Sequence, residues 1–194
     1  MCPRCGSLGR QRVDWLYLSE RTDLLRARVR LLHVAPERCF GHRLQALPNI
    51  AYLSADYDSA TAMEQMDITS IRYPDESFDV IICNHVLEHV SDDLRAMSEI
   101  RRVLRPGGWA MLQVPIDHDR EETFEDPTIT DPKERRRIFG QYDHARVFGR
   151  DYERRLASQG FEVTANEFVK ELPAQTVNEL QLDLDETIYI ATKR

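Results

Sequence analysis

The sequence predicts an α/β fold built on a mostly parallel β-sheet, and three observations favour it. Short apolar stretches alternate with amphipathic stretches from residue 30 onward. The segment 77–84, SFDVIICN, carries an unbroken apolar run, which is typical of a strand buried on both faces. Polar residues follow the predicted strands, as at Asp56 and Asn84. Because parallel strands end at one edge of the sheet, these residues predict a ligand site there.

Length and charge limit the class of protein further. A chain of 194 residues with 42% hydrophobic residues suits one domain with a sizeable core. The net charge of −7 disfavours a general binder of nucleic acid or of membrane surfaces. The first ten residues lack the apolar core of a signal peptide, and no apolar run reaches the roughly 18 residues of a membrane helix. We therefore expect a cytoplasmic protein whose cysteines are thiols or metal ligands rather than disulfides.

The first half of the chain predicts two helices and two strands before an unusually short connection. The helices are expected at 11–20 and within 40–49, and the strands at 30–34 and 50–56. Only the stretch YDSATAMEQ separates the second strand from the segment MDIT. That is too little chain for a full crossover helix with its loops. We therefore predict a shortened crossover between strands 2 and 3.

The second half predicts a further helix after the buried strand. Ser91 is expected to cap it, with Asp92 and Asp93 in its first turn, where they complement the helix dipole. The sequence PGG at 106–108 is expected to end it. The remaining expected elements are a strand at 109–115, a helix at 150–160, and an antiparallel pair of strands at 161–169 and 186–193.

Residues 116–149 are polar and irregular, and we interpret them as an insertion in a single domain over 11–194. Within the insertion Asp131 is expected to cap a helix that begins at Pro132 and stops at Gly140. Glu134 would complete a capping box.

The first ten residues form a separate segment that resembles half of a zinc knuckle. Cys2 and Cys5 stand three apart in CPRCG, as thiolate ligands of zinc do. A structural zinc needs four ligands, and the sequence places no second pair nearby. The two residues are therefore either free thiols or part of a zinc site that another segment completes.

The turn after the first strand has an uncommon composition. In LLHVAPERC, Ala35, Pro36 and Glu37 occupy positions where nucleotide-binding turns usually carry glycines. Glu37 would repel a pyrophosphate, and Pro36 removes an amide donor. The turn therefore disfavours a nicotinamide dinucleotide. Glu37 could alternatively cap the following helix.

Four motifs in order carry a family resemblance over roughly residues 30–169. They are LLHVAPE, SADYDS, MDITSIRYPDESFDVIICNHVLEHV and EIRRVLRPGGWAMLQVP. Together they resemble the class I S-adenosylmethionine (SAM) dependent methyltransferases, in particular the type 11 group. The resemblance implies a Rossmann-like seven-stranded sheet with helices on both faces and the last strand antiparallel. It also implies SAM as cofactor, lying across the strand ends.

The resemblance assigns roles to the residues at these strand ends. It implies Ala35 and Glu37 beside the methionine part, Asp56 at the ribose, Asp67 with Ile68 at the adenine, and Asn84 with His85 on the sulfonium side. A carboxylate at Glu37 suits SAM, because SAM carries two cationic groups that it would attract by about 1–4 kcal/mol at contact distance. Asp67 could alternatively cap a turn through its own side chain.

The acceptor side is predicted in the insertion. Methyl transfer needs positioning and sometimes a base, and we expect His144 as the base, assisted by Asp143 or Tyr142. A hydrogen bond from His144 to a loop carbonyl is an equally good interpretation. Arg146 could recognise an acidic acceptor. His118 is another polar candidate, but no short ligand spacing supports a metal, so none is predicted.

The sequence thus predicts a SAM-dependent methyltransferase that acts on a small molecule, for example a sugar or a related metabolite. The alternative is a non-catalytic binding protein that keeps the fold with a degenerate turn. A dinucleotide oxidoreductase is disfavoured by the missing glycines.

Overall fold

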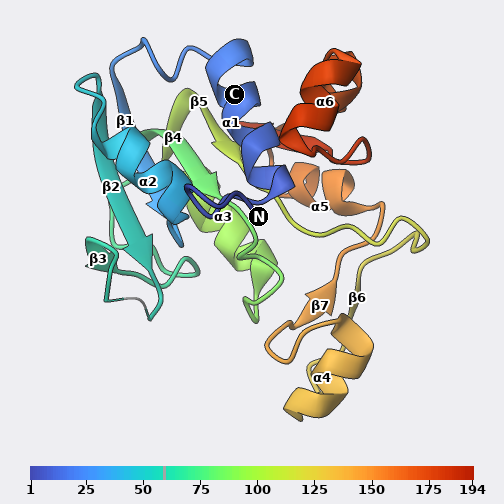
Figure 1. Cartoon of the computed structure of the whole chain (residues 1–194). Helices are drawn as coiled ribbons and strands as arrows, with labels where there is room; N and C mark the ends of the chain where they lie inside the picture. The colour runs from blue at the N-terminus through green and yellow to red at the C-terminus, as the bar shows by residue number, and fades with distance from the viewer. Residues whose placement is uncertain (59) are drawn as a thin grey trace.

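A computed structural model describes residues 1–58 and 60–194, and its centre is a seven-stranded sheet in the order β3-β2-β1-β4-β5-β9-β8. Strands β1 to β5 run parallel, and β9 is antiparallel to both of its neighbours. The strands of this sheet are β1 (Val29–Val34), β2 (Ile50–Asp56), β3 (Glu64–Gln65), β4 (Phe78–Cys83), β5 (Leu104–Met111), β8 (Glu162–Asn166) and β9 (Ile188–Thr192). The predicted Rossmann-like sheet with an antiparallel last strand is confirmed (Figure 1).

Helices cover both faces of the sheet, as predicted. They are α1 (Gly9–Arg21), α2 (Arg38–Gln45), α3 (Asp93–Val103), α4 (Pro132–Phe139), α5 (Tyr152–Ser158), α6 (Ala174–Leu180) and the 3₁₀ helix η1 (Phe168–Glu171). Leu31 of β1 packs in one core cluster with α1, α2 and η1, whereas its neighbour Leu32 packs in the other with α3 and α5. This alternation follows from the two-residue repeat of a strand. Among the described residues, no helix is both long and apolar enough to cross a membrane.

The crossover between β2 and β3 is as short as the sequence predicts. No helix lies between Asp56 and Glu64 among the described residues; Ser59, within this connection, lies outside them. β3 has two residues, and it pairs in parallel with the end of β2 through Ala55 and Glu64. This edge of the sheet is therefore open where other folds of this class place a helix.

The junction of α3 and β5 differs from the prediction. The cap is Asp92, whose Oδ1 accepts a hydrogen bond from the Arg95 amide at 2.9 Å, and not Ser91. The chain enters β5 directly at Leu104, so the sequence PGG lies inside the strand and does not end the helix. Leu104 pairs with Phe78 before the register shifts, and this irregularity accommodates the proline and glycines.

The insertion is more ordered than the sequence suggests. It contains β6 (Phe124–Glu125), α4 and β7 (Arg146–Val147), and β6 pairs with β7 in a small sheet that extends with α4 away from the body of the molecule (Figure 1). Asp131 caps α4 and Gly140 ends it with φ 89°, as predicted. The carboxylate of Glu134 accepts from Arg137 at 2.8 Å, which replaces the predicted capping box.

The segment between β8 and β9 also departs from the prediction. The predicted strand at 161–169 ends at Asn166, and Phe168 and Val169 are buried in η1 instead. Helix α6 was not predicted, because none of its residues is fully buried and its sequence shows no clear apolar stripe.

Candidate functional site

A cavity of about 660 Å³ opens at the carboxyl ends of β1, β2 and β4. This volume is within the range of small-molecule sites. Its lining residues come from the strand ends, from the turn after β4 and from the insertion: Val34, Ala35, Asp56, Tyr57, Met66, Asp67, Ile68, Thr69, His85, Val86, His89, Val90, Ser91 and Asp143. The sheet thus brings together the segments that the sequence analysis connected.

Five of the predicted cofactor residues line this cavity: Ala35, Asp56, Asp67, Ile68 and His85. Asp56 ends β2, and its Oδ1 accepts from the Asp58 amide at 3.0 Å. One carboxylate oxygen of Asp67 accepts from the amide and the hydroxyl of Thr69, at 2.8 and 2.7 Å. Asp67 therefore makes the turn that was its alternative interpretation and also borders the cavity.

The glycine-free turn takes a conformation that glycine usually supplies. Ala35 has φ 46°, in the left-handed region, and its amide donates to the Ala55 carbonyl at 2.8 Å. A residue with a Cβ adopts this conformation at a cost, and such strain is concentrated at functional sites. The turn keeps its shape without glycine.

Glu37 and Asn84 do not line the cavity. The Glu37 carboxylate lies 3.1 Å from His33 Nε2, and the other ring nitrogen of His33 lies 3.0 Å from the Tyr52 hydroxyl. Glu37 makes no side-chain bond to the start of α2, so it does not act as the alternative helix cap. Asn84 is buried, with its amide nitrogen 3.4 Å from a carboxylate oxygen of Asp14.

Asp14 of α1 is a buried acid behind the strand ends. Burial raises the pKa of Asp14 well above its usual value, and the charges of Glu37 and Glu186 raise it further. Oδ1 of Asp14 and Oδ1 of Asn84 have no hydrogen-bond partner among the described residues. The region around Asp14 and Asn84 therefore contains hydrogen-bond acceptors without a partner and lies close to other acidic side chains.

His85 lies where the first cavity meets a second one, because it lines both. Its φ of 54° is left-handed, and its amide donates to the Gln113 carbonyl at 2.7 Å. Its Nδ1 is 3.4 Å from Glu88 Oε1, whereas its Nε2 is buried without a partner in the part of the chain that the structure describes. A carboxylate that orients one imidazole nitrogen while the other stays available is an arrangement suited to proton transfer.

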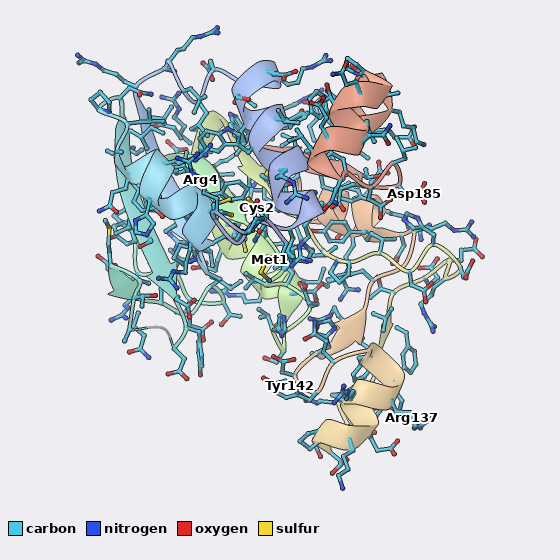
Figure 2. The ribbon with its side chains drawn as sticks, in the orientation of Figure 1. Met1, Cys2, Arg4, Arg137, Tyr142 and Asp185 are labelled. Atoms are coloured by element: carbon cyan, nitrogen blue, oxygen red, sulfur yellow. The ribbon has the colours of Figure 1, made fainter. Side chains whose placement is uncertain are left out.

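The second cavity, of about 320 Å³, is rich in acids. Asp183, Asp185 and Glu186 line it together with Arg10; Figure 2 labels Asp185, on the loop after α6. Burial raises the pKa of Glu186. Nε of Arg10 is buried without a partner among the described residues. The cavity can therefore bind a ligand that carries both an ammonium and a carboxylate.

The three predicted catalytic residues occupy different environments. Tyr142 is 63% exposed, beside α4 and outside the cavity (Figure 2). Asp143 lines the cavity, with Oδ2 3.3 Å from His89 Nδ1. His144 is buried, does not line the cavity and has Nδ1 3.1 Å from the Phe139 carbonyl, so the alternative interpretation describes its contact. Burial, and then His89, lowers the pKa of His144.

Arg146 connects the insertion to the turn after β4. Its guanidinium donates to the carbonyl groups of Leu87, Val90 and Ser91 and to the carboxylate of Glu125. Because its side chain is only 2% exposed and fully engaged, Arg146 does not recognise an acceptor, contrary to the expectation from the sequence. It holds the turn that carries His85 and His89.

Sequence reasoning did not assign roles to Glu88 and His89. Both lie in the quoted motif CNHVLEHV, where a carboxylate follows an apolar pair in the turn after a buried strand. The single carboxylate in this motif was the signal that could have indicated a functional role for Glu88. Its partner His144 lies far along the chain, so spacing alone could not reveal the group.

The cysteines are free thiols. Cys2, Cys5 and Cys39 line one hollow of about 280 Å³. Hydrogen bonding to Ser7 lowers the pKa of Cys5 to about 7. Zinc binding by Cys2 and Cys5 together with another segment stays the alternative to two free thiols.

A family model described as a methyltransferase domain matches residues 43–112, which include β2, β3, β4, α3 and β5 but not β1. This match agrees with the resemblance of the sequence to the type 11 SAM-dependent methyltransferases. The cofactor of this family is SAM, as the sequence predicts.

The curated relatives of this chain match it over short stretches. The ubiquinone/menaquinone biosynthesis C-methyltransferase of Bdellovibrio bacteriovorus is 43% identical over 49 residues, which are 25% of this chain. This match covers 21% of that relative. The match is therefore a small part of both chains.

Solved structures share the fold over nearly the whole chain. A SAM-dependent methyltransferase from Mesorhizobium loti superposes with a TM-score of 0.58 at 18% identity, covering 92% of this chain and 95% of that one. The [4+2]-cyclase SpnF superposes with a TM-score of 0.59 at 16% identity, covering 95% and 81%. Since a protein described as a cyclase shares this architecture, the fold alone does not decide the reaction.

Proposed function

We propose that the chain is a SAM-dependent methyltransferase that acts on a small-molecule acceptor and holds SAM in the first cavity. The observation that carries the proposal is the convergence of five predicted cofactor residues, from four separate segments, on one cavity of suitable size. If these five residues lay far apart in the structure, only the family resemblance would support SAM binding.

Each of these residues has a contact suited to one part of SAM. The Asp56 carboxylate would accept from the ribose hydroxyls, and Asp67, held in place by its turn to Thr69, would accept from the adenine amino group. Ile68, 5% exposed, supplies an apolar surface for the base. Bound SAM supplies a methyl group on a positively charged sulfur, which a nucleophilic acceptor atom attacks in line.

The electrostatics of the site favour SAM over a dinucleotide. Glu37 follows the turn after β1, and its carboxylate would attract the ammonium and sulfonium groups but repel a pyrophosphate. The amino-acid end of SAM would extend toward His85, where Arg10 offers a guanidinium for its carboxylate. A nicotinamide dinucleotide has neither cationic group at this position.

We assign removal of the acceptor proton to His85. The sequence prediction gives that role to His144 with Asp143 or Tyr142, but His85 borders both cavities and has a free, buried Nε2. Glu88 orients the opposite nitrogen of its ring. A polar acceptor with a hydroxyl or amino group, such as a sugar or a related metabolite, suits this surrounding.

The binding step is tested by calorimetric titration with SAM and with its demethylated product. Wild-type protein should bind both. Asp56→Asn should bind about ten- to a hundredfold more weakly, because hydrogen bonds to a charged group contribute about 1.5–3 kcal/mol. Asp23→Asn is the matched control, since Asp23 is exposed in the loop before β1, at the opposite edge of the sheet. Absence of binding by the wild type would contradict the proposal.

The transfer step needs a second measurement. Formation of demethylated SAM is followed while fractions of small polar metabolites are offered as acceptors. His85→Asn should keep SAM binding within a few-fold but lower turnover by about a hundredfold or more, the usual contribution of a general base. Tight SAM binding with no turnover on any fraction would favour the non-catalytic alternative.

A further inference from the structure

We propose that Glu88, His89 and His144 form a binding site for a divalent transition-metal ion of the zinc class, in the wall of the first cavity. Each residue offers one ligand atom, and these atoms all lie within 4.8 Å of one another. Glu88 and His89 come from the turn after β4, and His144 comes from the insertion. The fold, and not the sequence spacing, assembles the group.

Two of the three side chains carry buried polar atoms without a partner. Glu88 is 2% exposed and His144 is 5% exposed. Glu88 Oε2 and His144 Nε2 have no hydrogen-bond partner among the described residues. Leaving such atoms unpaired costs free energy, so native proteins rarely do so without a ligand or a bound water. A cation between these atoms would satisfy both.

The outer atom of each side chain is already held, as in metal sites whose ligands are oriented by a second layer of contacts. His144 Nδ1 lies 3.1 Å from the Phe139 carbonyl, so it carries the proton and Nε2 keeps its lone pair. His89 Nδ1 lies 3.3 Å from a carboxylate oxygen of Asp143. Glu88 Oε1 lies 3.4 Å from His85 Nδ1. In each case the atom left over is the one that can bind a cation.

The backbone around the group is fixed from the insertion. The Ala145 amide donates to the Glu88 carbonyl at 2.7 Å. Arg146 binds three carbonyl groups of the same turn. The rings of His89 and His144 meet at 85° with centroids 4.7 Å apart. The ligands are therefore held in place before any ion binds, which lowers the cost of binding.

The donor set indicates the class of ion. Two imidazoles and one carboxylate suit Zn²⁺ and neighbouring transition metals, whereas Mg²⁺ and Ca²⁺ prefer oxygen ligands throughout. Three protein ligands leave one position open, as in reactive rather than structural zinc sites. His89 and Asp143 line the first cavity, so the open position faces it.

An acceptor oxygen or nitrogen atom would take that open position. This role rests on the proposed function, but binding of the ion does not. Metal binding and SAM binding can therefore fail independently.

The test must exclude the cysteines, because Cys2, Cys5 and Cys39 share a hollow and thiolates bind zinc well. The protein used is accordingly the full chain with Cys2→Ser and Cys5→Ser. It is freed of metal and titrated with Zn²⁺, and with Co²⁺ as a spectroscopic probe. We expect one equivalent of metal and the visible absorption of a four- or five-coordinate Co²⁺ site.

Variants locate the ion. His89→Ala removes a partly exposed ligand with little effect on the fold, and it should lower the affinity at least tenfold and abolish the cobalt spectrum. Asp143→Asn should weaken binding by about ten- to a hundredfold through the orientation of His89. His42→Ala, which removes an exposed imidazole on α2, should change nothing.

Two outcomes would overturn the site: no bound metal in the serine variant, or unchanged affinity in His89→Ala. Calorimetry with SAM on the same metal-free protein reports on the proposed function separately. SAM binding without metal binding would reject the metal site alone.

Discussion

Two buried ionisable residues, Arg146 in the insertion and Asp14 in α1, show two different ways in which the protein holds a polar side chain away from water. Arg146 is 2% exposed and is surrounded by carbonyl groups and by the carboxylate of Glu125. Asp14 is 1% exposed and has an oxygen without a partner among the described residues. The first charge is satisfied by the protein itself, and the second is not.

This contrast distinguishes polar groups that stabilise the fold from polar groups that are available to a ligand. A buried charge with a complete set of partners stabilises one arrangement of the chain, here the contact between the insertion and the turn after β4. Unsatisfied polar atoms cost stability, and those of Asp14, Asn84, Glu88 and His85 gather near the carboxyl ends of the sheet. Ligand binding at that edge would explain why they are kept.

The largest effect is expected for Arg146→Met, which removes the charge but keeps much of the length of the side chain. It removes the guanidinium from three carbonyl groups and leaves Glu125 with Arg155 as its remaining partner, so the free energy of unfolding should fall by about 3–5 kcal/mol. Urea denaturation measures this change. Arg154→Ala is the control, because its pair with Glu122 is exposed and should contribute about 0–1 kcal/mol. Equal losses of stability in the two variants would contradict the claim that the buried, fully partnered Arg146 stabilises the fold more than an exposed ion pair does.

A smaller loss is expected for Gly149→Ala, which tests how closely the insertion packs on itself. A Cβ at this position would lie 2.7 Å from a backbone carbon of Glu122 and 2.9 Å from the Arg120 carbonyl oxygen. Backbone cannot move aside as a flexible side chain can, so we expect destabilisation of about 1–3 kcal/mol by urea denaturation. The matched control is Gly107→Ala, where no atom lies within 4 Å and only the φ of 77° opposes the substitution. A loss at Gly149 no larger than this conformational penalty would contradict the close packing.

Asp14→Asn should have the smallest effect and the opposite sign. Burial raises the pKa of Asp14 in the folded state, whereas the unfolded chain has the ordinary value. Between these two pKa values the folded state binds more protons, so this group lowers stability as the pH rises above about 4. The variant should therefore melt at a higher temperature than wild type at pH 8, with a smaller difference at pH 5. Glu20→Gln, an exposed change on the same helix, should show no such trend. A variant less stable than wild type at pH 8 would contradict the interpretation.

The elements that follow a simple repeat were predictable. The strands that end at Val34 and Asp56 and the buried strand at Phe78–Cys83 were located because burial imposes an apolar pattern on consecutive residues. The short crossover followed from chain length alone. The position of the cavity followed in turn, since parallel strands all end at the same edge.

Features that depend on distant contacts were not predictable. The start of β5 at Leu104 is set by pairing with Phe78, and α6 lacks an apolar stripe. The neighbourhood of His144 depends on Arg146, whose partners lie 55 to 59 residues away in the sequence. The spacing of residues along the sequence cannot predict such contacts. The cofactor half was therefore foreseen better than the acceptor half.

The most direct test of the account is hydrogen–deuterium exchange with and without the demethylated product of SAM. If the ligand binds where the strands end, protection should increase at 34–37, 56–69 and 85–91 and should extend through Arg146 to 143–147. The amino ends of the strands should be unaffected. Protection confined to other segments, or none at saturating ligand, would contradict the claim that this edge of the sheet is the cofactor site.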